Sequence, residues 1–403
     1  MKLFSVILLS IVFLTACQKT KEKTKVVVCV PVYGQSLGIG EDSELVTDID
    51  NMSERHDGRI LSEGLGKRFG YYEDNGMKQW TKRLIRYYKR RFENSSFAMA
   101  EVLADSLGKD TAICIFAGGR GATAISNLMK GSEPYETFLD NIRSSCEAAR
   151  RKGMEFIIPA ICWMQGESDM FDYTKVEYKR LLKQFAQDID KDVKAITGQQ
   201  RQVMIVCYQS CCLPICWRYN PLDFECYEAT VPQAQLDLIR YDSQFVAGTP
   251  VYPFSFVNQR IHLDGKSQQE VGKRNALAVL DILRNGMSAR GLYPTDVTTK
   301  DNVITVKYNN GRFPLLTDTV SMPKKSHFGF TVITRDGKDI CNSVITTADS
   351  INIICSETVD GCKLRYAVNG TKGKAGKHTD HGGNIKTLRD GMSNWCYMFS
   401  QSL

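Results

Sequence analysis

The amino-acid sequence predicts an α/β fold: a three-layer α/β/α arrangement around a parallel sheet, as in flavodoxin, followed by a small antiparallel β domain. Three observations predict it. From residue 26 to about residue 285, short apolar runs alternate with longer amphipathic ones. The apolar runs are dense in hydrophobic residues, as expected for parallel strands that are covered on both faces. After residue 290 the helical patterns stop, and runs of period two replace them.

Residues 1–17 are predicted to be an export signal and are set apart from the fold. Met1 and Lys2 precede an apolar run over residues 3–14, which is too short to span a membrane comfortably. The run ends in LTAC, which resembles the lipobox of bacterial lipoproteins, where the chain is cleaved before the cysteine and that cysteine is lipidated. We therefore expect a lipidated Cys17 at the mature N-terminus, with a plain secretory signal as the alternative. Residues 18–25, QKTKEKTK, have the composition of a tether, so the protein is expected in the cell envelope, on its periplasmic or cell-surface side, held to the membrane by the N-terminal lipid.

Length and charge limit the possible domain organisation and partners of the rest of the chain. The roughly 385 residues after the signal exceed the usual size of one domain, so we expect a large domain at 26–289 and a smaller one at 290–403. The net charge of +7 is modest, and the basic residues are scattered apart from a cluster at 82–91. On a predicted helix this cluster is a solvated face, and no nucleic-acid partner is expected.

Fourteen cysteines are many for an exported protein, whose compartment permits disulfides. Four of them stand inside apolar, strand-like runs and are predicted to be core residues: Cys29, Cys114, Cys162 and Cys207. A crowded group between residues 207 and 226 is compatible with a disulfide or, less readily, with a metal. No histidine lies among these cysteines and their spacing matches no zinc signature, so no metal site is predicted.

The large domain divides into strands and helices in alternation. The apolar runs at 26–32, 111–116, 155–163 and 203–208 are the predicted strands. The clearest helix covers 135–151, where Phe138, Leu139, Ile142 and Cys146 share one face and Gly153 follows the end. Further helices are predicted at 80–92, 97–107, 173–196 and 267–284. In such parallel sheets, ligands bind beyond the carboxyl ends of the strands.

Each predicted strand is followed by a short polar turn. The first runs into Gly34, Gln35 and Ser36, and the second into a glycine-rich segment at 117–125. The third runs into WMQGESD at 163–169, and the fourth into a glutamine and a serine at 209–210. Polar turns that gather at one sheet edge predict a functional site there, with Ser36 as a candidate nucleophile.

A serine nucleophile needs a base, and His262 is the best placed of the five histidines. It stands just before the last predicted helix of the large domain, in a loop that can reach back over the sheet edge. His56 lies in a long early loop, and His327, His378 and His381 lie in the C-terminal segment.

Taken together, these elements resemble the sialate O-acetylesterase-like branch of the SGNH hydrolases. They are GQS at 34–36, GATAI at 121–125, WMQGESD at 163–169 and the late His262, in the order and rough spacing of that family. The resemblance covers residues 26–284, and its most specific part is the tryptophan-x-glutamine-glycine-glutamate element. It implies an SGNH-type fold and a serine esterase.

The resemblance also implies roles for the site residues. Ser36 would attack an ester carbonyl, and His262 would take its proton and return it to the leaving sugar hydroxyl. Oxyanion and substrate contacts would come from the Ser36 N–H, from a backbone N–H near Gly121, from the Gln165 amide and from the neighbouring Gln35. Glu167 and Asp169 would either position the substrate or brace the loop; both possibilities stay open.

One position departs from the family pattern. Many members carry an aspartate three residues before the histidine, and here that residue is Gln259. A glutamine accepts a hydrogen bond from an imidazole but brings no charge. Three possibilities follow: a Ser-His dyad, a carboxylate recruited from elsewhere with Asp264 and Glu167 as candidates, or reduced or lost catalysis.

The C-terminal segment is predicted to be a β-sandwich-like accessory domain with strands near 303–308, 329–334, 350–355 and 362–368. Whether it binds carbohydrate or only caps the catalytic domain stays open. His378, Asp380 and His381 fall in a glycine-rich loop and are read as surface residues rather than metal ligands.

These observations predict a lipid-anchored carbohydrate esterase that removes acetyl groups from sugars without metal or organic cofactor. Its partners are an acetylated carbohydrate, such as a sialic acid, xylan or pectin, and the membrane. The net positive charge weakly favours an acidic glycan. The alternative, motivated by Gln259 and the appended domain, is a non-catalytic glycan-binding lipoprotein on a hydrolase scaffold.

Overall fold

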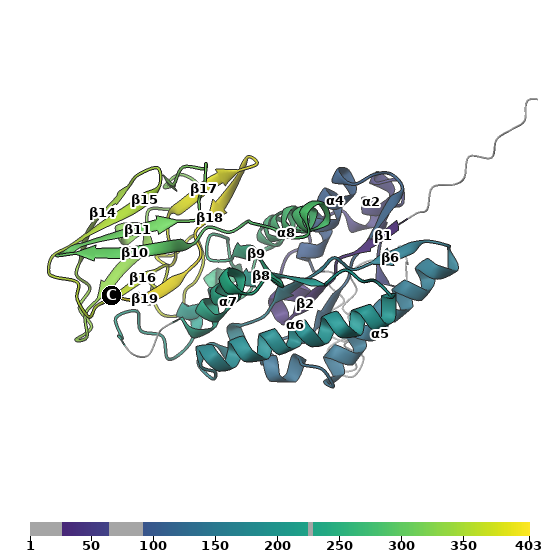
Figure 1. The fold of residues 1–403 in the computed structure, drawn as a ribbon, viewed down its shortest axis with the longest axis horizontal. Coiled ribbons are helices and arrows are strands. Elements are labelled where there is room, and N and C mark those ends of the chain that lie inside the picture. Colours follow the sequence, from purple (N-terminus) through teal and green to yellow (C-terminus); the bar gives the residue numbers. More distant parts are fainter. Residues whose placement is uncertain (1–25, 64–91, 225–228) are drawn as a thin grey trace, which may run out of the picture.

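The computed structural model describes residues 26–63, 92–224 and 229–403. Within them the chain forms a parallel α/β/α domain followed by antiparallel β structure (Figure 1), so the predicted fold class is confirmed. The predicted signal with Cys17, the tether, the helix at 80–92 and Cys226 lie outside the described residues. None of the helices that the structure describes is both long and apolar enough to cross a membrane.

The central sheet is built from strands that are interrupted partway. The first predicted strand forms β1 (Val26–Cys29) and β2 (Val32–Gly34), and the third forms β6 (Glu155–Ile157) and β7 (Ala160–Met164). Pro31 and Pro159 stand at these two interruptions, where a residue without an N–H is tolerated. The second predicted strand likewise forms β4 (Thr111–Cys114) and β5 (Ala117–Gly119).

All strand pairings in the first domain are parallel. The strand order is β3-β4-β1-β6 before the interruptions and β5-β2-β7-β8-β9 after them. The bounds of the strands not yet given are β3 Ile60–Leu61, β8 Met204–Gln209 and β9 Phe245–Pro250. The strand that ends at Gly34 is therefore central, and the turns after β5 and β7 lie on its two sides.

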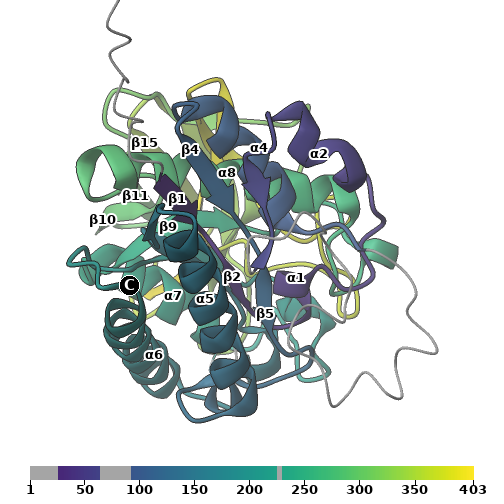
Figure 2. The same cartoon turned by 90° about the vertical axis from the view of Figure 1, so that its right-hand side faces the viewer.

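Helices cover both faces of this sheet. Figure 1 shows α4 (Ser95–Ser106) and α8 (Gly265–Asn285) on one face, with α5 (Glu133–Arg151), α6 (Lys175–Thr197) and α7 (Thr230–Tyr241) on the other. In the view along the sheet, α5 and α6 lie across β1 and β2 from α4 and α2 (Ile49–Arg55) (Figure 2). Tyr33 stacks on Phe185 of α6 at 5.3 Å between ring centroids and also contacts Phe138 of α5, so aromatic packing fixes that face to β2.

The C-terminal region consists of antiparallel strands in three small sheets. Their orders are β10-β11-β15-β14, β12-β17-β18 and β13-β16-β19. The bounds are β10 Pro294–Lys300, β11 Val303–Tyr308, β12 Leu316–Thr317, β13 Phe330–Ile333, β14 Cys341–Thr346, β15 Ser350–Cys355, β16 Lys363–Tyr366, β17 Ile385–Arg389, β18 Met392–Trp395 and β19 Phe399–Ser402. The four strands predicted here are all present.

Among the described α-helices and strands of the first domain, α1 (Ser36–Ile39), α2, α7, β3 and β9 were not predicted. Helix α7 carries a proline in its first turn and follows the cysteine-rich segment, so its helical periodicity was not recognised in the sequence. Strand β9, FVAGTP, contains a glycine and ends in a proline, which are turn signals in sequence. The four cysteines predicted to be core residues are all buried, and Cys211, Cys212 and Cys216 are free thiols.

Candidate active site

Ser36 stands at the turn that follows the central strand β2. The N–H of Gln35 donates to Met164 O at 3.0 Å, which continues the pairing of β2 with β7 up to the serine. Gly34 is required for this close approach, because a Cβ there would lie 2.1 Å from Met164 O. Ser36 begins the short helix α1 (Ser36–Ile39) and is 4% exposed.

The glycine-rich turn after β5 lies next to Ser36. The Arg120 N–H donates to Gly34 O at 3.1 Å, and a Cβ placed on Gly121 would lie 3.7 Å from Ser36 Cβ. Within the described chain, the structure gives no hydrogen-bond partner to the N–H of Ser36 or of Gly121. Two free backbone donors beside a serine hydroxyl are the arrangement that an ester oxyanion requires.

Gln165 and Gln35 hold the turn after β7 in place. The Gln165 amide donates to Thr123 O at 3.2 Å and to the Asp169 carboxylate, and its Oε1 accepts from Tyr178 OH at 3.0 Å. Both amide hydrogens thus have internal partners, and an oxyanion role for Gln165, which stays a prediction, would require it to exchange one. Gln35 Oε1 accepts from the N–H groups of Gly166 and Ser168, each at 3.4 Å.

Glu167 and Asp169 both have bracing contacts. Glu167 is buried and accepts from Tyr208 OH at 2.6 Å and Ser210 Oγ at 2.7 Å, which ties the turn after β7 to β8. Burial raises the pKa of its carboxyl, and those two hydroxyls oppose the rise. Asp169 accepts from the Ile125 N–H at 3.1 Å, and burial raises its pKa from 3.8 to about 6.

His262 is paired with a carboxylate that the sequence analysis missed. Its Nδ1 lies 2.7 Å from Asp42 Oδ2, and Asp42 stands six positions after Ser36 in the loop that follows α1. The His262 side chain is 15% exposed and that of Asp42 is 52% exposed. With its proton on Nδ1 the imidazole donates to Asp42, and its Nε2 is then the basic atom.

A second contact holds these two loops together. The buried Ser43 Oγ donates to Leu263 O at 2.6 Å, so a hydrogen bond joins the residue after Asp42 to the residue after His262. The backbones also meet at Gly265, where a Cβ would lie 2.0 Å from Glu44 O. The Asp42–His262 pair therefore belongs to a close-packed junction rather than to two free loops.

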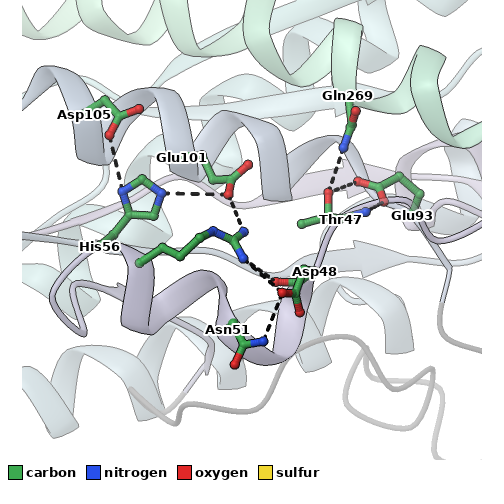
Figure 3. A network of polar contacts seen from close by, with 9 residues as sticks. Thr47, Asp48, Asn51, His56, Glu93, Glu101, Asp105 and Gln269 are labelled. Atoms are coloured by element: carbon green, nitrogen blue, oxygen red, sulfur yellow. Dashed lines mark hydrogen bonds and ion pairs between the residues drawn. The ribbon is translucent and has the colours of Figure 1, made fainter.

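The far end of the Asp42 loop is fixed by a buried carboxylate. Glu93 accepts from the N–H groups of Val46 and Thr47, each at 2.8 Å, and from Thr47 Oγ1 at 2.7 Å. Gln269 of α8 donates to the same hydroxyl oxygen at 3.0 Å (Figure 3). The loop is thus anchored to the helix that begins just after His262.

The remaining contacts in Figure 3 form a network between α2 and α4, and none of them involves Ser36. Arg55 on α2 pairs with Asp48 and Glu101, and His56 Nδ1 lies 3.3 Å from Asp105. His56 is engaged with α4, so the structure leaves it outside the site, in agreement with the sequence analysis.

None of the three residues considered as partners of His262 makes a hydrogen bond to it. Gln259 is exposed and has a left-handed backbone, with φ of 57°. Asp264 caps α8 by accepting from the Ser267 N–H at 2.8 Å, and Glu167 has the partners given above. Asp42 was missed because only the folded loop brings it to His262; the signal in the sequence is an acidic pair, Glu41 and Asp42, shortly after GQS.

Glu41 adds a second acidic group at the site. Its Oε2 lies 2.8 Å from the point where a Cβ on Gly121 would stand, and Ser36 Cβ lies 3.7 Å from the same point. Burial raises the pKa of its carboxyl and the nearby His262 opposes that rise.

An open cavity of about 610 Å³ adjoins the oxyanion turn. Its polar lining comes from the turns beside Ser36 and from the segment that leads into α5: Arg120, Thr123, Ser126, Asn127, Ser132, Glu133 and Ser168. Arg120 forms an ion pair with Glu133 inside it. Nowhere in the described residues, this site included, is a group of three or more His, Cys, Asp or Glu side chains arranged to hold a metal ion.

One family model and several solved structures are similar to this chain, and the structure with a TM-score of 0.60 given below supports the fold. Residues 91–281 match the family model described as carbohydrate esterase, sialic acid-specific acetylesterase. A carbohydrate acetylesterase from Xanthomonas citri is 12% identical with a TM-score of 0.60, over 94% of this chain and 80% of that one. A protein from Arabidopsis thaliana is 18% identical with a TM-score of 0.46, over 64% of this chain and 98% of that one. Among curated proteins, none matches the chain.

Proposed function

We propose that this protein removes acetyl groups from sugars with Ser36 as its nucleophile, a function supported by the match of residues 91–281 to the model of the sialic acid-specific acetylesterases, which are carbohydrate esterases. The observation that carries the proposal is the 2.7 Å contact between His262 Nδ1 and Asp42 Oδ2, in the loop that leaves the Ser36 turn. A serine, a histidine and a carboxylate at one sheet edge, beside two free backbone N–H groups, form the constellation of a serine hydrolase.

In the first half of the reaction, Ser36 Oγ attacks the acetyl carbonyl while His262 Nε2 takes the serine proton. The tetrahedral oxyanion accepts hydrogen bonds from the N–H groups of Ser36 and Gly121. The carbon–oxygen bond to the sugar then breaks, and His262 gives its proton to the departing sugar oxygen. The products of this half are the deacetylated sugar and an acetyl ester on Ser36.

In the second half, water attacks the acetyl-serine and His262 takes a proton from that water. Collapse of the second tetrahedral intermediate breaks the bond to Ser36 Oγ, which recovers its proton from His262, and acetate leaves. Asp42 accepts a hydrogen bond from the Nδ1–H group throughout, which holds the ring in one tautomer and stabilises the imidazolium that forms in each half.

The cavity beside Gly121 is proposed to hold the sugar. Its hydroxyl and amide groups suit a polyhydroxylated ligand. Arg120, the one cationic side chain among the residues that line it, is already paired with Glu133. The carboxylate of Glu41 lies next to Gly121. These charges favour a neutral acetylated sugar, as in xylan, over the carboxylate of a sialic acid, contrary to the weak preference for an acidic glycan expected from the net charge of +7.

The test is hydrolysis of p-nitrophenyl acetate and of acetylated xylan, pectin and O-acetylated sialic acid by purified protein. We expect Ser36→Ala and His262→Ala to lose at least about 10³-fold in kcat, since the base and the nucleophile act as a unit. Ser53→Ala is the control, because Ser53 is a buried serine of α2 outside the site. Wild-type turnover equal to that of Ser36→Ala on every substrate would refute the proposal and favour the non-catalytic glycan binder.

The proposal includes a lipid anchor at Cys17, which would keep the enzyme at the cell envelope. Intact protein is then expected in the membrane fraction, carrying the mass of attached acyl chains. A Cys17→Ser variant is expected to be released. Wild-type protein without added lipid mass would support the plain secretory signal instead.

A further inference from the structure

A loop of the C-terminal region packs on the segment that carries the catalytic histidine. We call residues 371–381 the bracing loop and residues 254–262 the His262 loop. The Ala375 N–H donates to Gln259 O at 2.9 Å, and the Lys377 N–H donates to Phe254 O at 3.0 Å. A third contact joins His378 Nε2 to Ser255 Oγ at 3.0 Å. Three hydrogen bonds thus connect the two loops at points spread along the His262 loop.

The His262 loop needs such support because part of its backbone is strained. Asn258 and Gln259 are consecutive non-glycine residues in the left-handed region, with φ of 52° and 57°. A non-glycine residue held there raises the free energy of the folded chain, and it persists only where its surroundings fix it. The carbonyl of Gln259, the second of them, is the acceptor that Ala375 binds. His262 follows three positions later, and its own carbonyl accepts from the Val257 N–H at 2.7 Å.

The bracing loop is itself firmly held by the C-terminal region. The buried Lys325 donates through Nζ to Lys377 O at 2.8 Å and to Thr379 O at 2.5 Å. The Asp380 carboxylate accepts from the Thr371 N–H at 2.9 Å and from its hydroxyl at 2.6 Å, which closes the loop across its base. At the contact, Gly376 has φ of 94°, and a Cβ there would lie 2.4 Å from the Phe256 ring.

We propose that the bracing loop sets the position of His262, so that the C-terminal region is a working part of the active site rather than an independent carbohydrate-binding module. Ala375 is the positioning residue, acting through Gln259 on the histidine. The inference rests on the proposed function, because it assigns the benefit of this contact to the general base. A displacement of about 1 Å at a catalytic group lowers a rate by about 10²-fold, so a modest loosening of this loop is enough to be measured.

Three variants test the proposal with the full chain. Ala375→Pro removes the N–H that binds Gln259 O, whereas Ala375→Gly keeps it. Lys372→Pro is the matched control, since the structure gives no hydrogen bond from the Lys372 N–H to any described residue. With p-nitrophenyl acetate, which is too small to reach a remote glycan site, we expect Ala375→Pro to lose about 10²-fold in kcat with KM within about twofold of wild type. Ala375→Gly and Lys372→Pro are expected to stay within about threefold of wild type in kcat.

Hydrogen–deuterium exchange supplies a readout that does not depend on turnover. Amides of the His262 loop are expected to exchange at least about tenfold faster in Ala375→Pro than in Lys372→Pro, with the central strands unchanged. If wild-type protein proves to have no esterase activity, that result counts against the proposed function alone. The exchange measurement still tests whether the bracing loop holds the His262 loop in place. If Ala375→Pro does not fold, His378→Ala removes the side-chain contact to Ser255, and a several-fold loss of kcat is expected.

Two results would overturn the inference. One is unchanged exchange in the His262 loop together with unchanged kcat on p-nitrophenyl acetate in Ala375→Pro. The other is a loss seen only as a higher KM on polymeric acetylated glycan, because that result would make the C-terminal region a separate binding module.

Discussion

The Nδ1 atom of His262 lies 2.7 Å from the Oδ2 atom of Asp42, a residue 220 positions earlier in the chain. This contact supplies the carboxylate that Gln259 does not. Asp42→Asn is expected to lower kcat on p-nitrophenyl acetate by about 10²- to 10³-fold, less than the roughly 10⁴-fold of a buried triad aspartate, because Asp42 is partly exposed.

Two further variants separate this effect from a general loss of surface charge. Asp42→Glu keeps the carboxylate and is expected to recover part of kcat. Asp48→Asn removes an aspartate of similar exposure, 56% against 52%, and is expected to leave kcat unchanged. Equal rates for Asp42→Asn and wild type would show that a Ser-His dyad is sufficient.

The hydrogen bond from Ser43 to Leu263 O gives a second prediction. Ser43→Ala and Ser53→Ala each remove a buried hydroxyl that donates to a backbone carbonyl, at 2.6 Å to Leu263 and at 2.7 Å to Ile60. Both changes are expected to lower the free energy of unfolding by about 1–3 kcal/mol in urea denaturation. Only Ser43→Ala is also expected to lower kcat, by about tenfold, because it loosens the junction that carries Asp42 and His262. A similar kcat in both variants would contradict this.

Asp169 gives a prediction about pH. Its pKa is about 6 in the folded protein against 3.8 ordinarily, so between these values the folded protein retains a proton that the unfolded chain has lost. The contribution of Asp169 to the free energy of unfolding therefore falls as pH rises from about 4 to about 6, and is constant above that. In urea denaturation from pH 4.5 to 7.5, the difference in free energy of unfolding between wild type and Asp169→Asn should become less favourable to wild type as pH rises towards 6. An advantage that grows with pH over this range would mean that the carboxylate is stabilised by folding.

The cavity beside Gly121 gives a prediction about substrate binding. Arg120→Gln removes a donor from its lining and is expected to raise KM for acetylated sugars by about 3- to 10-fold. The kcat on p-nitrophenyl acetate should change little, because that ester has no sugar to place there. Arg143→Gln on α5 is the control, since Arg143 forms a comparable surface ion pair with Asp140 outside the cavity. The same rise of KM in both variants would argue against this cavity as the sugar site.

Much of the scaffold could be predicted because buried strands and helix faces require apolar residues, which are visible in the sequence. Strands covered on both faces are uniformly apolar, so the segments that became β1, β4, β7 and β8 were visible. Their polar turns then indicated the sheet edge, and the choice of Ser36 as candidate nucleophile followed from that rule. The interruptions within the strands were not predicted, although Pro31 and Pro159 stood at two of them.

The partner of His262 could not be predicted, because it depends on how two loops meet. Asp42 has φ of 62°, a conformation that no spacing rule indicates, and its loop is held by contacts from Ser43 and Glu93 to distant parts of the chain. The inward contacts of Glu167 and Asp169 were equally hidden, since a carboxylate in a polar turn looks the same in sequence whether it faces substrate or braces the turn.

The separation of Asp42 and His262 along the chain also bears on when the protein becomes active during its synthesis. A nascent chain displays the Ser36 turn early, but its base is added 220 residues after Asp42, and the bracing loop emerges more than a hundred residues later still. Contacts of such high sequence separation form late in folding, after the entropy of closing long loops has been overcome. The proposed site should therefore be the last part of the growing polypeptide to assemble, and a translation product that ends before residue 262 would lack the proposed base.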